Sequence, residues 1–289
     1  MRSQQQDKNR EEMRKQCVII FKDTYEKCEK YTPLREAIEQ SKKLTKIYLE
    51  NQKYNFYGKE IKSQVYNIII TRDRTLQSVQ KYYLPSKIKG KTCILNFASE
   101  KHPGGGVWHG ARTQEESICR SSTLYPCLIT DFLKDNYYSY NIEKKSEKYN
   151  RIVYIPNVLV FKSDDNIFAE MLNEKDWYYV DVITCAAHNQ KAYKLDYEKL
   201  KQVNYNKIKS IIESAVENNV DNLILGAFGC GAFANDPKLV SLTFKKVLID
   251  EQYFKYFKNV HFAIFTMFDE DVNLIEFRKT FDKYAKYIE

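Results

Sequence analysis

The feature that most constrains this chain is a run of three glycines, Gly104-Gly105-Gly106, followed closely by Gln114-Glu115-Glu116. The chain has only nine glycines in 289 residues, so composition alone does not account for three in a row. Glycine lets backbone amides approach a ligand without an intervening Cβ atom, and it adopts positive φ without steric cost. Two carboxylates just after such a loop indicate a ligand site with acid/base chemistry.

The residues around the triplet predict a strand before it and a helix after it. Cys93–Ala98 is a short apolar run of the length of a buried strand. Ile118, Leu124 and Leu128 are spaced like the buried face of a helix, which Pro126 kinks or ends. The carboxylates then fall in the first helical turn, where free amide N–H groups and the helix dipole favour an anion.

The same helix start also has a purely structural interpretation. Thr113 and Glu116 fit a capping box, with Thr113 as the N-cap and Glu116 folding back onto it. Acidic residues are common in a first turn for electrostatic reasons alone. The glycine triplet and Asn96, at the end of the preceding strand, favour a functional role, and both interpretations can hold together.

A second glycine-containing segment follows another apolar run. Leu223–Leu225 predicts a buried strand, Gly226–Gly231 a loop, and Asn235-Asp236-Pro237 a capped helix start. This order suits a diphosphate held by backbone amides, although the glycines could also serve only a tight turn. Two such loops favour a dinucleotide-like ligand, while their spacing differs from the Rossmann fingerprint.

Strand and helix patterns alternate along the chain, which predicts a layered α/β fold with a largely parallel sheet. Strands are expected at Val65–Ile70, Thr92–Phe97, Ile152–Ile155, Tyr178–Thr184, Asn222–Phe228 and Val260–Phe265, and helices near 116–133, 204–218, 237–250 and 273–287. Residues 1–64 are predicted to form an N-terminal helical extension with a flexible start, and residues 65–289 the catalytic domain. Both glycine loops lie at carboxyl ends of strands, where ligands of such sheets collect.

Composition limits the compartment and the partners. Seven cysteines, an odd number without a Cys-x-x-Cys pair, predict free thiols in a reducing compartment and no metal site. The polar N-terminus and the lack of a long apolar run predict a cytoplasmic or nuclear protein without a membrane contact. The net charge of 46 − 38 = +8 suits an anionic ligand. No basic helix or stacking motif indicates direct binding of nucleic acid.

Several motifs together form an ordered set across much of the chain. They are Asn96-Phe97-Ala98-Ser99, Pro103–Val107, Gly110-Ala111, Gln114–Ser117, Cys119–Ser122, Leu124-Tyr125, Val158–Phe161, Ala186-Ala187-His188-Asn189 and Gly229–Pro237. In this order they resemble the microbial-type poly(ADP-ribose) glycohydrolases, a family of macrodomain enzymes. The resemblance covers roughly residues 65–270. It implies a three-layer α/β/α macrodomain with a mixed, largely parallel sheet.

The resemblance also implies a chemistry and a set of site residues. Hydrolysis of a ribose–ribose O-glycosidic bond requires a proton for the leaving oxygen and stabilisation of an oxocarbenium-like sugar. Glu116 would be the catalytic acid and then the base, while Glu115 and Asn96 would bind ribose hydroxyls. The glycine amides would bind the diphosphate and Phe233 the distal ribose, without metal or cofactor. The expected substrate-binding residues are Asn96, Gly104, Gly105, Gly106, Val107, Gln114, Asn189, Gly229, Cys230, Gly231, Ala232 and Phe233.

Three classes of function fit these residues. A poly(ADP-ribose) glycohydrolase releasing ADP-ribose from chain ends is favoured, because both acidic residues are present at the family's spacing. A non-catalytic ADP-ribose reader would need the loops but not Gln-Glu-Glu, and a hydrolase of mono-ADP-ribosylated protein is the third class. The expected partners are poly(ADP-ribose) or ADP-ribosylated proteins, with ADP-ribose as product. His102 and Trp108 lie near the triplet, but the sequence assigns them no role.

Overall fold

The computed structural model describes residues 2–50, 52–84, 88–144, 151–166 and 168–287, so Met1 lies outside the described residues. Within this part, eight strands form one sheet in the order β1-β4-β5-β3-β6-β7-β2-β8. The strands are β1 (Lys46–Tyr48), β2 (Ile68–Thr71), β3 (Thr92–Phe97), β4 (Ile152–Val160), β5 (Tyr178–Cys185), β6 (Asn222–Leu225), β7 (Asn259–Ala263) and β8 (Ala285–Tyr287). Among the described strands, β4 alone runs antiparallel to its two neighbours, β1 and β5. This confirms the predicted mixed, largely parallel sheet.

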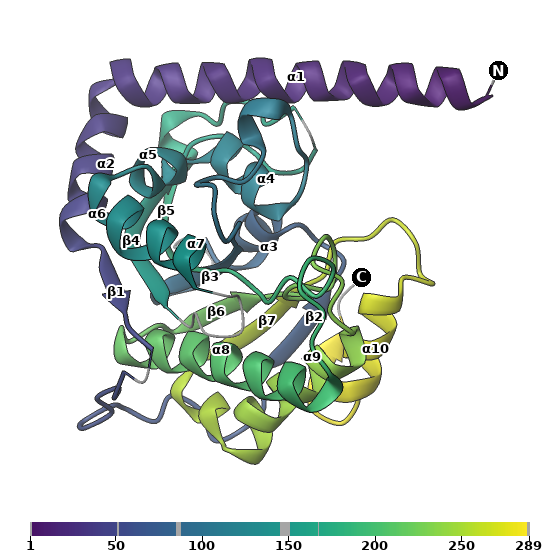
Figure 1. Cartoon of the computed structure of the whole chain (residues 1–289). Helices are drawn as coiled ribbons and strands as arrows, with labels where there is room; N and C mark the ends of the chain where they lie inside the picture. Colours follow the sequence, from purple (N-terminus) through teal and green to yellow (C-terminus); the bar gives the residue numbers. More distant parts are fainter. Residues whose placement is uncertain (1, 51, 85–87, 145–150, 167, 288–289) are drawn as a thin grey trace.

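Helices cover both faces of the sheet (Figure 1). The α-helices are α1 (Arg2–Lys30), α2 (Thr32–Leu44), α3 (Thr75–Tyr82), α4 (Gln114–Ser121), α5 (Leu124–Leu128), α6 (Asp131–Leu133), α7 (Ser139–Glu143), α8 (Tyr197–Glu217), α9 (Pro237–Lys245) and α10 (Val272–Phe281). Short 3-10 or π segments are η1 (Val107–His109), η2 (Lys134–Tyr138), η3 (Glu174–Asp176), η4 (Lys246–Asp250) and η5 (Tyr253–Tyr256). The result is the expected three-layer arrangement.

The central strand β3 explains why two cores form. It is buried along its length between the parallel strands β5 and β6, as the run of apolar residues predicts. Successive side chains of a strand point to opposite faces. Cys93 and Leu95 therefore join the core under α8, α9 and α10, whereas Ile94 joins the core under α4 and α5.

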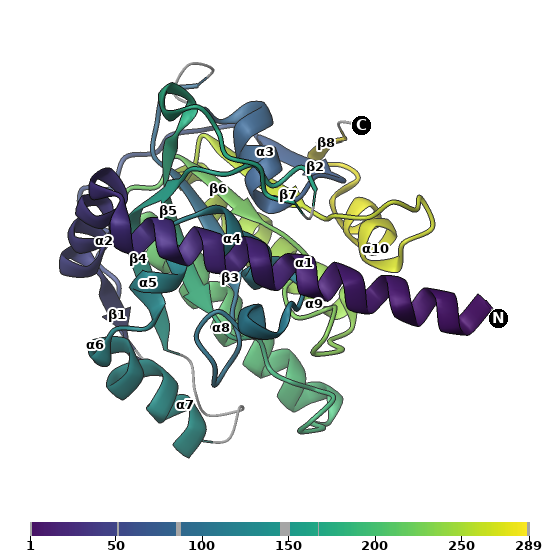
Figure 2. The ribbon, with the colours of Figure 1, turned by 90° about the horizontal axis from the view of Figure 1, so that it is seen from above.

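The N-terminal segment is helical and spans one face of the molecule. The first turns of α1 extend beyond the body, and later turns cross above the helices on that face (Figure 2). Contact with the first glycine region is close: a Cβ atom on Gly110 would lie 2.2 Å from the carbonyl oxygen of Arg14. The helical extension ends at Leu44, because Lys46–Tyr48 pairs with β4 at the edge of the sheet. The division of the chain at residue 64 stays a prediction.

Other differences from the sequence prediction have local causes. Strand β4 continues past Pro156 to Val160 because the ladder shifts register between Ile155 and Val158, where Asn157 adopts a φ of +57°. The last predicted helix, 273–287, is wrong at its end, since α10 ends at Phe281 and β8 follows. The helix predicted over 116–133 is broken into α4, α5 and α6.

The composition-based expectations have structural counterparts. All seven cysteines are free thiols, and six of them are buried. Among the described residues, no helix combines the length and the apolar run that crossing a bilayer requires.

Candidate active site

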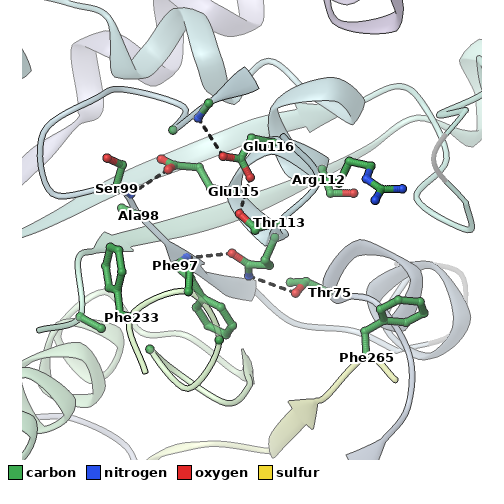
Figure 3. Close-up of a pocket in the computed structure, with 18 of the residues that line it drawn as sticks. Thr75, Phe97, Ala98, Ser99, Arg112, Thr113, Glu115, Glu116, Phe233 and Phe265 are labelled. Atoms are coloured by element: carbon green, nitrogen blue, oxygen red, sulfur yellow. Dashed lines mark hydrogen bonds between the residues drawn. The ribbon is translucent and has the colours of Figure 1, made fainter. Parts of the chain in front are cut away.

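A cavity of about 880 Å³ opens at the carboxyl ends of β3, β6, β7 and β2, and both glycine loops contribute to its wall. Figure 3 shows Glu115 and Glu116 at the start of α4, with Phe233 near Ala98 and Ser99 at one end. Phe265 lies at the opposite end of the same view. The cavity therefore lies at the edge of the sheet where the sequence predicts it.

Glu116 is held in place by the first glycine loop and by Thr113, the N-cap residue of its own helix. Its Oε1 accepts a 2.8 Å hydrogen bond from the Gly106 N–H, and its Oε2 accepts from the Thr113 hydroxyl. Thr113 is the N-cap residue, but its side chain makes no capping hydrogen bond to the backbone. The capping-box interpretation is therefore wrong. Both residues direct their side chains toward each other at the wall of the cavity.

Glu115 is more deeply enclosed, with 2% of its surface exposed. Its Oε2 accepts a 2.7 Å hydrogen bond from the Ser99 N–H, and its Oε1 accepts from the Asn96 amide at 3.3 Å. Burial raises the pKa of Glu115 to about 8, although these two donors act in the opposite direction. Glu115 therefore tends to hold a proton near neutral pH.

Gly105 is required because the two carboxylates lie against it. A Cβ atom at this position would lie 2.3 Å from Oε1 of Glu116 and 3.1 Å from Oε2 of Glu115. The φ of Gly105 is +60°, in the left-handed region that favours glycine. The loop thus brings its backbone directly against both acids.

Backbone amides of the first glycine loop donate hydrogen bonds to acceptors within the protein. The N–H of Gly106 donates to Glu116, that of Gly105 donates to the His102 carbonyl oxygen at 2.9 Å, and the Gly104 amide faces Glu115. The expectation that the amides of Gly104–Gly106 face a diphosphate is therefore wrong. The Gly105 amide already donates to the loop itself, and the Gly106 amide already donates to Glu116.

The second loop has the opposite character. Gly231, Ala232 and Phe233 line the cavity, and their amide N–H groups donate to no acceptor among the described residues. A Cβ atom on Gly231 would meet no atom within 4 Å, so protein packing does not require glycine there. Asn235 fixes the loop by donating to the carbonyl oxygen of Gly229 at 3.1 Å. This arrangement presents free amides to an anion.

Two residues expected to bind substrate instead position α4 against β3. Asn96 is fully buried and does not line the cavity, because its amide donates to Glu115. Gln114 lines the cavity, but its Oε1 accepts from the Phe97 N–H at 2.8 Å and its Nε2 donates to the Leu95 carbonyl oxygen at 2.6 Å. Both side chains hold the acids in place.

Four other expected contacts lie outside the cavity wall. They are Gly104, Val107, Cys230 and Asn189, whereas Gly105, Gly106, Gly229, Gly231, Ala232 and Phe233 do line it. Val107 is fully buried in the core. A Cβ atom on Gly104 would lie 2.6 Å from the Tyr125 ring, so this glycine serves packing. Asn189 accepts from the Ala192 N–H at 3.0 Å and closes a turn.

The far end of the cavity contains residues that the sequence did not single out. The Arg74 guanidinium lies 4.2 Å from the centre of the Phe265 ring, and Asp164 lies 4.0 Å from Arg74. Burial raises the pKa of Asp164 to about 6, against the Ser117 hydroxyl and nearby arginines. These residues come from separate segments without a motif, so only the fold brings them together. His102 and Trp108 also line the cavity, and the indole of Trp108 donates to the Tyr125 hydroxyl at 2.6 Å.

The fold and the site define a macrodomain-like α/β enzyme with a pair of acids packed against one glycine loop and free amides on the other. The sequence model of the microbial-type PARG catalytic domain, where PARG stands for poly(ADP-ribose) glycohydrolase, matches residues 14–163. The chain belongs to this family. No curated protein sequence gives a significant match.

Solved structures of bacterial members are similar over most of the chain. The poly(ADP-ribose) glycohydrolase of Thermomonospora curvata is 26% identical with a TM-score of 0.81, covering 92% of this chain and 99% of its own. The same protein bound to the inhibitor ADP-HPD is 27% identical with a TM-score of 0.78, and the match covers 91% of this chain and 98% of its own. The Deinococcus radiodurans enzyme in complex with ADP-ribose is 25% identical with a TM-score of 0.72, and the match covers 85% of this chain and 97% of its own.

Proposed function

We propose that this protein is a poly(ADP-ribose) glycohydrolase that cleaves ribose–ribose O-glycosidic bonds and releases ADP-ribose from chain ends. The observation that carries the proposal is the pair of buried acids held against Gly105 in a cavity whose other loop offers free amides. The solved relatives are glycohydrolases of this polymer, and one of them binds ADP-ribose. The expected partners are poly(ADP-ribose) or ADP-ribosylated proteins, and the free thiols suit a cytoplasmic or nuclear location.

Glu116 and Glu115 have different roles in the mechanism. Glu116 gives a proton to the leaving ribose oxygen and then takes one from the attacking water. The Gly106 N–H and the Thr113 hydroxyl hold its two oxygens in a fixed orientation. Glu115 lies beside it and contacts the distal ribose, while the buried Asn96 orients Glu115.

Binding of the substrate is assigned to the second loop and to the aromatic residues at the two ends of the cavity. The amides of Gly231 and Ala232 bind the diphosphate, because they have no acceptor among the described residues. Phe233 packs on the distal ribose near the acids, and Phe265 lies where the other end of the ligand extends (Figure 3). No metal is needed to supply the proton or to activate the water in this sequence of steps.

The test is release of ADP-ribose from purified poly(ADP-ribose) by the wild type and by Glu116→Gln, together with calorimetric binding of ADP-ribose by both. We expect turnover to fall by roughly 10²–10⁴-fold, as for loss of a general acid–base group. Binding should change by less than about threefold, since the amide keeps the shape of the side chain.

The matched control is Glu198→Gln, which changes an exposed glutamate on α8 and should leave both readouts unchanged. Tight binding without turnover by the wild type would contradict the proposal and make the protein a reader of ADP-ribose. Full turnover by Glu116→Gln would remove Glu116 from the mechanism.

A further inference from the structure

The inference concerns the polymer beyond the cleaved bond, and it rests on the proposed function. That bond joins the distal ribose of one ADP-ribose unit to the adenosine ribose of the next unit. The next unit must therefore leave the cavity at the end that holds Glu116. Phe233 and Ser99 lie at this end, and Phe265 lies at the other (Figure 3).

Two surface segments are anchored to this end. In the first, Ser99 donates its N–H to Glu115, and its hydroxyl oxygen accepts from the N–H groups of Lys101 at 3.4 Å and His102 at 3.1 Å. The turn that carries Lys101 is thus tied directly to one of the two acids. His102 itself is exposed and lines the cavity.

In the second segment, residues 189–195, Gln190 donates its N–H to the carbonyl oxygen of Phe233 at 3.0 Å. The His188 ring lies 2.6 Å from the carbonyl oxygen of Tyr193, which fixes the backbone of this segment from below. Asn189 closes its first turn by accepting from the Ala192 N–H. The segment is therefore tied to the residue that packs on the distal ribose.

The two segments meet at the surface. The Lys101 ammonium lies 3.1 Å from the Tyr193 hydroxyl and 5.5 Å from the centre of its ring. It also lies 3.4 Å from a carboxylate oxygen of Glu100. Tyr193 is 43% exposed, and the exposed Lys191 and Lys194 make no ion pair with another described residue. We name Lys101, Lys191, Tyr193 and Lys194 the leaving-side patch.

We propose that the leaving-side patch binds the ADP-ribose unit next to the one held in the cavity. Adenine stacks on the exposed face of Tyr193, and the diphosphate of that unit lies near the ammonium groups of Lys101, Lys191 and Lys194. An aromatic side chain surrounded by cations is the combination that a chain of bases and phosphates requires. The patch would make the enzyme prefer polymer over substrates with a small leaving group.

The opposite rim of the cavity is largely apolar, and the acidic residues that follow it are partly engaged within the protein. Met267 and Phe268 are 74% and 70% exposed there, next to Phe265. They are followed by Asp269-Glu270-Asp271, in which Asp269 pairs with Arg72 and Asp271 caps α10. The apolar rim also lies at the end of the cavity remote from the acids.

The test compares two substrates that share the ADP-ribosyl group. One is poly(ADP-ribose), and the other is ADP-ribose with an O-linked nitrophenyl group on the distal ribose. The variants are Tyr193→Ala and the double variant Lys191→Glu/Lys194→Glu. The controls are Tyr179→Ala, an exposed tyrosine at the far end of β5, and Lys199→Glu/Lys201→Glu on α8.

We expect each leaving-side variant to lower kcat/KM on polymer by about 5- to 20-fold and on the nitrophenyl substrate by less than about twofold. The effect of the lysine variant should shrink as salt is added, because its contacts are to phosphates. The controls should leave both substrates unchanged.

Three results would overturn the proposal. An equal loss on both substrates would mean that Tyr193 only supports the active site, and no loss on either would mean that the next unit lies elsewhere. When a mono-ADP-ribosylated peptide is assayed as a third substrate, a loss confined to this peptide would assign the patch to the acceptor protein.

A binding measurement separates this proposal from the proposed function. In the Glu116→Gln background, Tyr193→Ala should weaken binding of a two-unit ADP-ribose fragment by about 5- to 20-fold and leave binding of ADP-ribose unchanged. This result is expected whether or not the wild type hydrolyses polymer. If the two-unit fragment binds Glu116→Gln equally well with and without Tyr193→Ala, the role proposed for the leaving-side patch is wrong. The assignment as a hydrolase would not be affected.

Discussion

The loop at 104–106 and the loop at 229–232 both follow a buried parallel strand and both precede a helix, yet their amides have different partners. In the first loop the Gly105 amide donates to the loop itself and the Gly106 amide donates to Glu116, and a Cβ atom on Gly105 would collide with Glu116. In the second loop the amide of Gly231 has no acceptor among the described residues, and the space around a Cβ atom on Gly231 is open, whereas a Cβ atom on Gly229 would lie 2.6 Å from the Cβ atom of Ala187. One loop is shaped around the protein's own side chains, and the other leaves room for a ligand.

The difference shows what a glycine in a loop means. Glycine marks a close approach, but the approaching group can be a side chain of the same protein. The surroundings of the missing Cβ atom distinguish the two cases. If the first loop serves catalysis and the second serves binding, changes in the first loop should lower turnover and changes in the second should weaken ligand binding.

Gly105→Ala should lower turnover of poly(ADP-ribose) by about 100-fold or more, roughly 2.7 kcal/mol in the barrier. The added Cβ atom would lie 2.3 Å from the Glu116 carboxylate and displace it. The positive φ adds a cost of about 1–2 kcal/mol to the stability of the fold. Turnover and Tm are the two measurements.

The control for that variant is Gly58→Ala, because Gly58 has a φ of +72° with no atom near its would-be Cβ. It should share the loss of stability and keep full turnover. A Gly105→Ala enzyme that retains turnover within a few-fold would break the account of the first loop.

Glu115→Gln should remove a pH-dependent loss of folding stability of about 3–5 kcal/mol. Burial raises the pKa of Glu115 from an ordinary 4.5 to about 8, so between these values the folded state holds a proton that the unfolded state releases. Rising pH therefore favours unfolding of the wild type over this range and has no further effect above about pH 8. Glutamine cannot titrate, so this loss disappears in the variant.

The measurement is the free energy of unfolding of both proteins between pH 5 and pH 8. The stability of Glu115→Gln relative to wild type should rise steadily across this range, whereas Glu198→Gln, on the exposed surface of α8, should follow the wild type. Parallel pH profiles for wild type and Glu115→Gln would show that Glu115 is ionised in the folded protein.

Thr113→Val should lower turnover about fivefold and leave stability within about 0.5 kcal/mol. The hydroxyl of Thr113 donates to Glu116 and makes no cap to the backbone. Thr130→Val is the matched control, because the Thr130 side chain does accept from the Leu133 N–H. That control should lose about 1 kcal/mol of stability and no activity. The reverse pattern would restore the capping interpretation of Thr113.

Much of the fold follows from the sequence because it depends on local apolar patterns. The bounds of β3 and the proline start of α9 follow from an apolar run and from Asp236-Pro237. The short strands β1 and β8 could not be predicted, because three-residue edge strands are set by their partners in the ladder. The register shift near Asn157 likewise depends on pairing with β5.

The sequence predicts the chemical groups of the site, but not the directions in which its backbone amides and side chains point. The acids and both glycine loops lie at the cavity, as their positions after strands indicate. Which way an amide points depends on the tertiary path of the loop, and the sequence carries no signal for it. The same holds for Asn96, whose burial turns it toward Glu115, and for Arg74 and Phe265, which meet only in the folded chain.

The most direct test of the two-loop account is calorimetric binding of ADP, which has the diphosphate but lacks the distal ribose. The account predicts that Gly231→Ala weakens ADP binding by about tenfold, whereas Gly105→Ala binds ADP within about threefold of the wild type. Loss of ADP binding in Gly105→Ala together with unchanged binding in Gly231→Ala would assign the diphosphate to the first loop and contradict the account.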